Sequence, residues 1–241
     1  MKSTFSISVI IPAFNEAMNL EAIVEDSNKN LMGLTSKYEI IVIDDLSMDS
    51  TKEKLSTLKK NYPCLRTIHN EHNLGCHPSC LVGFKVARNE MLVFLPADGQ
   101  VPARNISKFI ENLSSYDLVC SYRRQREDTF FRRLASKLYN MILRLFFRIN
   151  LHDTHSAIAV KKEVVKVIGN KIKSHSSFAG CEFILQTIKH GYKVTEIEVE
   201  HLPRKAGRAT GANLKDAVLT PINLLQFWWK SFEHKREAIR T

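Results

Sequence analysis

The chain has 241 residues, of which 44% are hydrophobic and 25% charged, and this ordinary globular composition excludes collagen-like and low-complexity proteins. Lys and Arg number 35 against 25 Asp and Glu, and the resulting net charge of +10 favours partners that carry phosphate. No apolar run reaches the roughly 18 residues of a membrane-spanning helix, and the five cysteines show no disulfide framework, which favours a reducing compartment.

The first half of the chain alternates between short apolar runs rich in β-branched residues and segments with helical periodicity. Strands are predicted at residues 5–13, 38–43, 65–68 and 91–95, and helices at 18–32, 50–62 and 78–89. Strands and helices that alternate at this spacing predict an α/β fold, in which helices cover both faces of a mostly parallel sheet.

The second half is less regular. Strands are predicted at residues 117–122, 158–160 and 193–199, and helices at 130–149 and 183–190. The 130–149 helix has an apolar stripe and an otherwise basic surface, and the apolar segment 218–229 ends in aromatic residues beside Lys230. Each is interpreted either as a helix that packs on the protein or as an interfacial helix on an anionic membrane surface.

Polar residues follow three of the predicted strands. In such sheets ligands bind beyond the carboxyl ends of the strands, and Asp44, Asp45 and Asp98 stand at these ends. Two adjacent carboxylates are costly to bury without a partner, and the N–H groups of a nucleobase or the hydroxyls of a ribose are suitable partners. A carboxylate beside a phosphate ester needs a bridging cation, for which Mg²⁺ or Mn²⁺ is suited. Taken alone, Asp98 is more readily interpreted as part of an Ala-Asp-Gly turn.

In their order along the chain, the motifs are far more specific. They are Pro12-Ala13-Phe14-Asn15-Glu16, Asp44-Asp45-x-Ser47-x-Asp49, Asn73-x-Gly75 and Asp98-Gly99-Gln100, followed by Ser121-x-Arg123, Arg132-Arg133-x-x-Ser136, Asp153 and Arg204-x-x-Gly207. This series resembles the family 2 glycosyltransferases of the GT-A fold, and within them it is most similar to the dolichyl- and polyprenyl-phosphate sugar transferases.

The resemblance implies an enzyme that moves a sugar, with inversion, from a nucleotide sugar (GDP-mannose or a UDP-hexose) to a polyprenyl or dolichyl phosphate. It implies a GT-A domain over residues 1–210, a C-terminal amphipathic helix over 211–241 and a peripheral position on the cytoplasmic face of the membrane. It implies Mg²⁺ or Mn²⁺ as cofactor, and no nucleic-acid partner. The second pKa of a phosphate monoester is about 6, so this acceptor needs no general base.

The resemblance also implies roles for individual residues. The catalytic residues would be Asp98, Gln100 and Arg123, with Asp98 as the metal ligand, and the acceptor phosphate would bind Arg132, Arg133 and Ser136. The donor would bind Pro12, Ala13, Phe14, Glu16, Asp44, Asp45, Ala97, Asp98, Arg204 and Arg208. The sequence departs from the family pattern at Pro96, where the metal motif usually has a second Asp.

Two other functions remain open on the sequence alone. The acceptor of a related transferase would be a sugar or protein hydroxyl, which needs a general base, and Glu182 and Asp153 are the candidates. A non-catalytic module would bind the nucleotide sugar without consuming it. Nucleic-acid binding is disfavoured because the chain lacks basic residues interleaved with aromatic ones.

Overall fold

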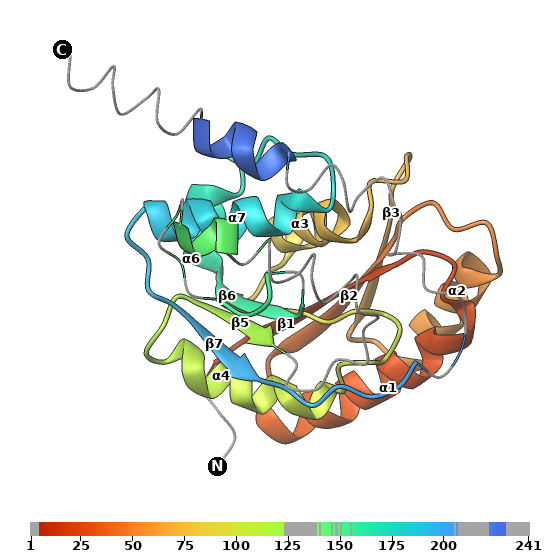
Figure 1. Ribbon diagram of the computed structural model, residues 1–241. Coiled ribbons are helices and arrows are strands. Elements are labelled where there is room, and N and C mark those ends of the chain that lie inside the picture. Colours follow the sequence, from red (N-terminus) through yellow and green to blue (C-terminus); the bar gives the residue numbers. More distant parts are fainter. Residues whose placement is uncertain are drawn as a thin grey trace.

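The computed structural model describes residues 5–122, 139, 141–145, 147, 149, 151–154, 156–204, 206 and 222–229. Its centre is a seven-stranded sheet in the order β3-β2-β1-β4-β6-β5-β7 (Figure 1). The strands are β1 (Ile7–Ala13), β2 (Tyr38–Asp44), β3 (Leu65–His69), β4 (Met91–Phe94), β5 (Leu118–Tyr122), β6 (Ile158–Lys161) and β7 (Val194–Glu198).

Every strand pair in this sheet is parallel except those that involve β6, which runs antiparallel to both β4 and β5. The predicted mostly parallel α/β sheet is therefore confirmed. Because β4 and β5 are both antiparallel to β6, they run in the same direction. The carboxyl ends of β1, β2, β4, β5 and β7 consequently share one edge of the sheet, here called the rim.

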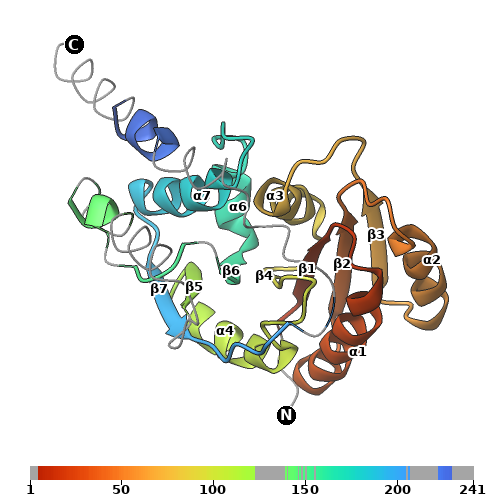
Figure 2. The same cartoon turned by 45° about the vertical axis from the view of Figure 1, so that its right-hand side comes forward.

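Helices cover both faces of the sheet (Figure 2). One face carries α1 (Ala17–Leu34), α2 (Thr51–Asn61) and α4 (Ile106–Leu113), which follows the short 3₁₀ helix η1 (Ala103–Asn105). The other face carries α3 (Cys76–Val86), α6 (Lys162–Ile168) and α7 (Phe178–Lys189). Alternate residues of β1 belong to two separate hydrophobic clusters, Val9 to the first and Ile10 to the second. This is expected of a strand buried on both faces.

Gly83 allows α3 to lie close against the sheet. A Cβ atom at this position would stand 2.4 Å from Cγ2 of Ile10 and 2.7 Å from Cδ1 of Ile43. Only glycine therefore lets the helix backbone approach β1 and β2 this closely. The approach places the first turn of α3 and the preceding loop over the end of β2, where the polar residues of the rim begin.

The observed helices depart from the predicted ones at several points. The helix predicted at 78–89 is shifted toward the N-terminus, and the one predicted at 183–190 begins five residues earlier, at Phe178. Neither α4 nor α6 was predicted, although the buried residues Ile106, Phe109, Ile110 and Leu113 give α4 a clear helical period. Residues 139, 141–145 and 147 are helical within the predicted 130–149 helix, and 222–229 are also helical.

Candidate active site

The loops that follow β1 and β2 are hydrogen-bonded to each other. Asn15 has a positive φ of 55°, a conformation that Asn tolerates better than most residues. Its side-chain Oδ1 accepts hydrogen bonds from the backbone N–H groups of Met48 and Asp49, and its own N–H donates to Oγ of Ser47. Asp49 also accepts from the N–H of Ala17 at 3.3 Å. The two loops thus form one rigid part of the rim.

Asp45 is buried, with 2% of its surface exposed. Its carboxylate accepts four hydrogen bonds of 2.7–2.9 Å, from the N–H groups of Leu74 and Gly75 and from the side chains of Asn70 and Ser79. These are the partners that a buried carboxylate requires. Asp45, predicted to bind the donor, therefore holds the 70–79 loop and the start of α3 against the sheet.

Asp44, the last residue of β2, is also buried. Its carboxylate accepts a hydrogen bond from the N–H of Ser47 at 3.0 Å and lies 3.0 Å from Nδ1 of His69. Burial alone would raise the pKa of Asp44, but hydrogen bonds from Ser47 and His69 outweigh it and hold the pKa below its usual value. Asp44 is therefore charged at neutral pH, at the rim beside the loop that contains Asn15.

Arg204 links the rim to a segment from the far end of the chain. This segment, residues 199–204 and 206, is here called the strap. One terminal nitrogen of Arg204 forms an ion pair with Glu16, and the other lies 3.7 Å from a carboxylate oxygen of Asp98. Glu16 also accepts a hydrogen bond of 2.5 Å from Asn19. Burial raises the pKa of Glu16 despite the lowering effects of Asn19 and Arg204.

Asp98 lies in the loop that follows β4, beside Ala97, which is buried. Gly99 has a φ of +69°, a conformation that favours glycine, and it turns the chain so that the N–H of Gln100 donates to Asp98 at 3.0 Å. Gln100 is paired with the strap, because its carbonyl oxygen accepts from the N–H of Leu202 at 2.8 Å. Its side-chain amide donates to the carbonyl of Leu202 at 3.4 Å.

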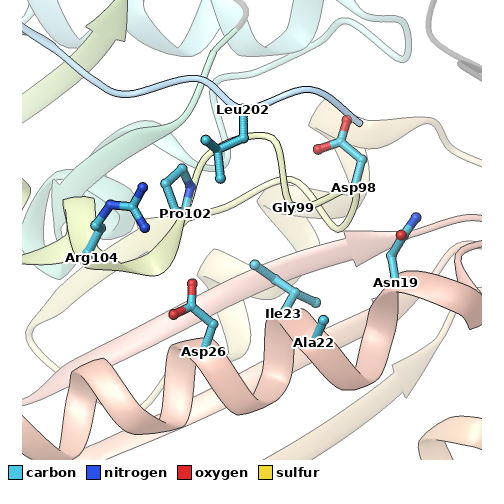
Figure 3. A pocket seen from close by; sticks show the side chains of 9 residues that line it. All are labelled: Asn19, Ala22, Ile23, Asp26, Asp98, Gly99, Pro102, Arg104 and Leu202. Atoms are coloured by element: carbon cyan, nitrogen blue, oxygen red, sulfur yellow. The ribbon is translucent and has the colours of Figure 1, made fainter. Parts of the chain in front are cut away.

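A pocket of about 240 Å³ opens beside Asp98. Figure 3 shows it between α1 and the strap, with Asn19, Ile23 and Asp26 on the helix and Leu202 above them. Its lining residues are Asn19, Ala22, Ile23, Asp26, Asp98, Gly99, Pro102, Arg104 and Leu202. The pocket therefore combines an apolar wall with carboxylate, amide and guanidinium groups.

The chemistry of Asp98 fits a divalent cation that completes its coordination with substrate oxygens. Mg²⁺ characteristically binds one or two carboxylates together with substrate phosphates and water. Within the described ranges, no group of three or more His, Cys, Asp and Glu side chains lies close enough to hold a metal ion. Asp98 could hold such an ion from the protein side, together with phosphate oxygens of a substrate and water.

The remaining predicted site residues fall into two groups. Pro12 and Ala13 are buried at the end of β1, and Phe14 is half-buried in the loop that follows. The structure brings these residues together with Glu16, Asp44 and Asp98 at the rim. The others lie outside the described residues; they are Arg123, Arg132, Arg133, Ser136 and Arg208.

The two candidate general bases are buried. Both carboxylate oxygens of Glu182 accept backbone hydrogen bonds, from the N–H groups of Lys173 at 3.2 Å and Ser174 at 2.9 Å. Glu182 therefore fixes the loop that precedes α7. Asp153 has 7% of its surface exposed. The environment of Glu182 is that of a structural carboxylate.

Asn19 was missed by sequence reasoning, although it contacts Glu16 and the strap and also lines the pocket beside Asp98. Its side-chain amide donates to Glu16 and, at 3.2 Å, to the carbonyl of Ala206 in the strap, and it lines the pocket beside Asp98. Its spacing of three residues from Glu16 is a usable signal, because residues three apart are neighbours on a helix.

The chain matches the family model described as Glycosyl transferase family 2 over residues 8–169. This match covers more than half of the chain, which therefore belongs to glycosyl transferase family 2. The predicted family membership is confirmed.

Among curated proteins, the chain is similar to undecaprenyl-phosphate 4-deoxy-4-formamido-L-arabinose transferases. The protein from Serratia proteamaculans (strain 568) is 28% identical over 222 residues, which cover 91% of this chain and 65% of the relative. The protein from Proteus mirabilis (strain HI4320) is 27% identical over 213 residues, covering 87% and 64%. The predicted similarity to polyprenyl-phosphate sugar transferases is thus confirmed, and the chain spans just under two thirds of these relatives' length.

Solved structures of glucosyl-3-phosphoglycerate synthase from Mycobacterium tuberculosis share the fold. One of them superimposes with a TM-score of 0.71 at 16% identity, covering 94% of this chain and 82% of the other. A complex of the same enzyme with Mn²⁺, uridine diphosphate and phosphoglyceric acid gives a TM-score of 0.68 at 15% identity, covering 92% and 78%. These likenesses confirm the predicted GT-A fold.

Proposed function

We propose that the protein transfers a sugar from a nucleotide-sugar donor to a polyprenyl phosphate, with inversion at the anomeric carbon. The observation that carries this proposal is the convergence of Glu16, Asp98 and Arg204 at the rim of a family 2 fold. The similarity to undecaprenyl-phosphate sugar transferases supports the choice of acceptor. The chemistry also agrees, because this site offers charge neutralisation and positioning rather than a covalent nucleophile.

The donor is proposed to lie across the rim. Its nucleoside would bind between the loops after β1 and β2, where Pro12, Ala13, Phe14, Glu16 and Asp44 lie; Asp45, the remaining predicted contact, would shape this site through the 70–79 loop that it holds. A rigid loop pair is suited to this task, because a preorganised site avoids the cost of ordering side chains on binding. The diphosphate would then lie beside Ala97, Asp98 and Gln100, within reach of the Arg204 guanidinium and, as the resemblance implies, of Arg208.

A divalent cation, Mg²⁺ or Mn²⁺, would neutralise the diphosphate and stabilise it as a leaving group. Asp98 would hold that cation from the protein side. The guanidinium of Arg204 would add positive charge where negative charge develops on the departing diphosphate. Uridine diphosphate complexes of the structurally similar synthase contain Mn²⁺ or Mg²⁺, which supports this choice of ions.

The transfer step is a direct displacement. An ionised oxygen of the polyprenyl phosphate forms a bond to the anomeric carbon, and the bond between that carbon and the donor diphosphate breaks with its electron pair. A nucleoside diphosphate leaves, and the configuration is inverted. Because the acceptor's second pKa is about 6, no protein group has to remove a proton. The structural role of Glu182 is consistent with this scheme, since no base is required.

The acceptor phosphate is proposed to bind Arg132, Arg133 and Ser136, and Arg123 is proposed as a further catalytic residue; all four lie outside the described residues. Apolar surface is available on the described part of the predicted 130–149 helix, where Met141 and Leu145 are exposed. Ile222, Leu225 and Trp229 are exposed on the 222–229 helix. The two helices touch through the rings of Phe147 and Phe227, 6.0 Å apart.

The surface formed by these two helices is proposed to lie on the cytoplasmic face of a membrane, where the lipid acceptor is found. Exposed aliphatic and aromatic side chains on a basic helix are typical of interfacial binding. Within the described residues, no helix is both long and apolar enough to span a bilayer.

A donor and acceptor panel tests the proposal. Purified protein would be incubated with Mn²⁺ and GDP-mannose, UDP-glucose or UDP-GlcNAc, with and without a short polyprenyl phosphate, and with 3-phosphoglycerate as the alternative acceptor. We expect release of nucleoside diphosphate only when polyprenyl phosphate is present, and its loss in Asp98→Ala. The control is Asp117→Asn, because this carboxylate pairs with Lys161 at the sheet edge opposite the rim. Donor binding without release would contradict the proposal.

A further inference from the structure

The strap is held to the rim by the same carboxylates that the donor and its cation are proposed to use. We propose that the strap is a donor-responsive latch, in which Arg204 pairs with Glu16 and Asp98 in the donor-free protein and exchanges them for the donor diphosphate. This inference rests on the proposed function, because it takes its ligand from there. It adds a conformational step and assigns a positioning role to Asn19.

The charges at the rim favour such an exchange. Glu16 and Asp98 lie on either side of one guanidinium, and the charge of Asp98 adds to burial in raising the pKa of Glu16. One positive charge therefore serves two negative ones. A divalent cation bound to Asp98 would neutralise that carboxylate in place of Arg204 and would repel the guanidinium. The two phosphates of the donor would attract the guanidinium.

The two halves of the Arg204 contact differ in closeness. The Glu16 half is a direct ion pair, whereas the Asp98 half spans 3.7 Å, longer than a hydrogen bond. The contact between Arg204 and Asp98 is thus the weaker of the two, and an incoming cation would displace Arg204 from Asp98 more easily than from Glu16. Arginine suits this role because its planar fork of N–H donors matches both carboxylate and phosphate oxygens.

The strap has a fixed start, because Val199 is buried in the hydrophobic core and Glu200 forms an ion pair with Arg104. Beyond these two residues and Arg204, it is held by hydrogen bonds. Asn19 donates to Glu16 and to the carbonyl of Ala206, and Gln100 pairs with Leu202. Hydrogen bonds of this kind are readily replaced by bonds to water or ligand. Their net contribution to holding the strap at the rim in the donor-free protein is therefore modest. Asn19 does not reach Asp98 or Arg204 through any of these bonds. It acts as a positioning residue that fixes the strap through Glu16 and Ala206.

The first test is a metal-binding titration that follows free Mn²⁺ by electron paramagnetic resonance. In the absence of nucleotide, we expect Arg204→Met to bind Mn²⁺ more tightly than the wild type, by about fivefold, because the competing cation is gone. With UDP or GDP present, the same variant should bind less tightly than the wild type, because the phosphates lose a partner. Arg88→Met is the matched control, since Arg88 is exposed at the edge opposite the rim, and it should change neither affinity.

A static salt bridge gives a different pattern. If Arg204 only supported the fold, its replacement would weaken Mn²⁺ binding in both conditions or leave both unchanged, and either result overturns the latch. Because Arg204→Met leaves Glu16 without its counter-ion, a second variant keeps the proposal testable. This variant is Asn19→Ala, which removes one hydrogen bond to the strap and one to Glu16, the partner of Arg204, and no charge.

The second test measures hydrogen exchange at the backbone N–H of Leu202, which donates to Gln100. Without ligand, Asn19→Ala should exchange several-fold faster than the wild type. With saturating Mn²⁺ and the nucleoside diphosphate that binds, the two proteins should exchange alike, because the latch contacts are no longer made. An equal effect of Asn19→Ala in both states would overturn the latch alone. If neither UDP nor GDP binds with Mn²⁺, the proposed function fails, and the latch fails with it.

Discussion

Asp45 and Asp98 both follow buried strands of one sheet, yet the structure gives them different surroundings. Asp45 is 2% exposed and receives four hydrogen bonds from the loop that it holds. Asp98 is partly exposed, receives one backbone hydrogen bond and faces a guanidinium at a distance. A carboxylate with its bonding capacity filled stabilises the fold, whereas one with capacity left is available to a ligand.

The largest effect is expected for a substitution of Asp98, which should lower activity strongly while changing stability little. Asp98→Ala should lower sugar transfer by at least about 100-fold, because it removes the protein ligand of the cation proposed to neutralise the leaving diphosphate. Its free energy of unfolding should stay within about 0.5 kcal/mol of the wild type, as for other partly exposed polar residues. Steady-state kinetics and urea denaturation of the same preparation measure both. Full activity in this variant would contradict the role given to Asp98.

Asp45→Ala should give the opposite pattern. Four donors would be left in a buried site without their acceptor, so we expect a loss of about 3 kcal/mol or more in the free energy of unfolding. Urea denaturation followed by circular dichroism measures this loss, with Asp49→Ala as a more exposed control on the neighbouring loop. A loss below about 1 kcal/mol would show that the 70–79 loop does not depend on Asp45.

Asp44 and Glu16 should make contributions to stability that depend on pH in opposite directions. The folded-state pKa of Asp44 is lowered, because hydrogen bonds from Ser47 and His69 outweigh burial. Its stabilising contribution is thus present at neutral pH and lost as the pH falls through that value. The folded-state pKa of Glu16 is raised, chiefly by burial, so its contribution is present at low pH and lost as the pH rises through that value.

Two isosteric variants test these opposite signs. Between about pH 3 and pH 7, Asp44→Asn should make stability less sensitive to acid than in the wild type, and Glu16→Gln should make it more sensitive. Urea denaturation at several pH values gives the slopes. Slopes that change in the same direction would contradict the assigned surroundings of one of the two residues.

The smallest effect is expected at a surface ion pair that the site does not use. Lys54 and Glu21 join α2 to α1 at 2.5 Å, with 33% and 59% of their side chains exposed. Lys54→Ala should change the free energy of unfolding by less than about 0.5 kcal/mol, because exposed ion pairs contribute little. A thermal melt beside that of Asp45→Ala would show the contrast. A loss of stability as large as that of Asp45→Ala would mean that burial does not determine how much the Asp45 and Glu21 carboxylates contribute to stability.

Local sequence pattern was enough to predict strands β1 to β4 and, to within a few residues, helices α1 to α3. Strands β1, β2 and β4 are largely apolar runs with polar residues at or after their ends, so a mostly parallel sheet and the position of the rim could be predicted. The antiparallel direction of β6 could not, because the direction of a strand depends on the path of the long connection before it. The short helix α6 has too few turns for its period to stand out.

The position of the acidic residues of the candidate site could be predicted, but their contacts could not. The pattern placed Asp44, Asp45 and Asp98 at strand ends, and the structure agrees. It could not separate Asp45 from Asp98, because the donors to Asp45 come from residues 25–34 positions later in the chain. The pairing of Glu16 with Arg204 spans 188 positions, and such a contact leaves no local signal.

The most direct test of the central claim is the mass of the lipid after reaction. The protein would be incubated with the nucleotide sugars of the panel, Mn²⁺ and undecaprenyl phosphate in detergent, and the extracted lipid would be analysed by mass spectrometry. We predict that one donor adds a single sugar residue to the lipid phosphate, and that Asp98→Ala abolishes the addition. Donor consumption that leaves the lipid mass unchanged would contradict a polyprenyl-phosphate transferase.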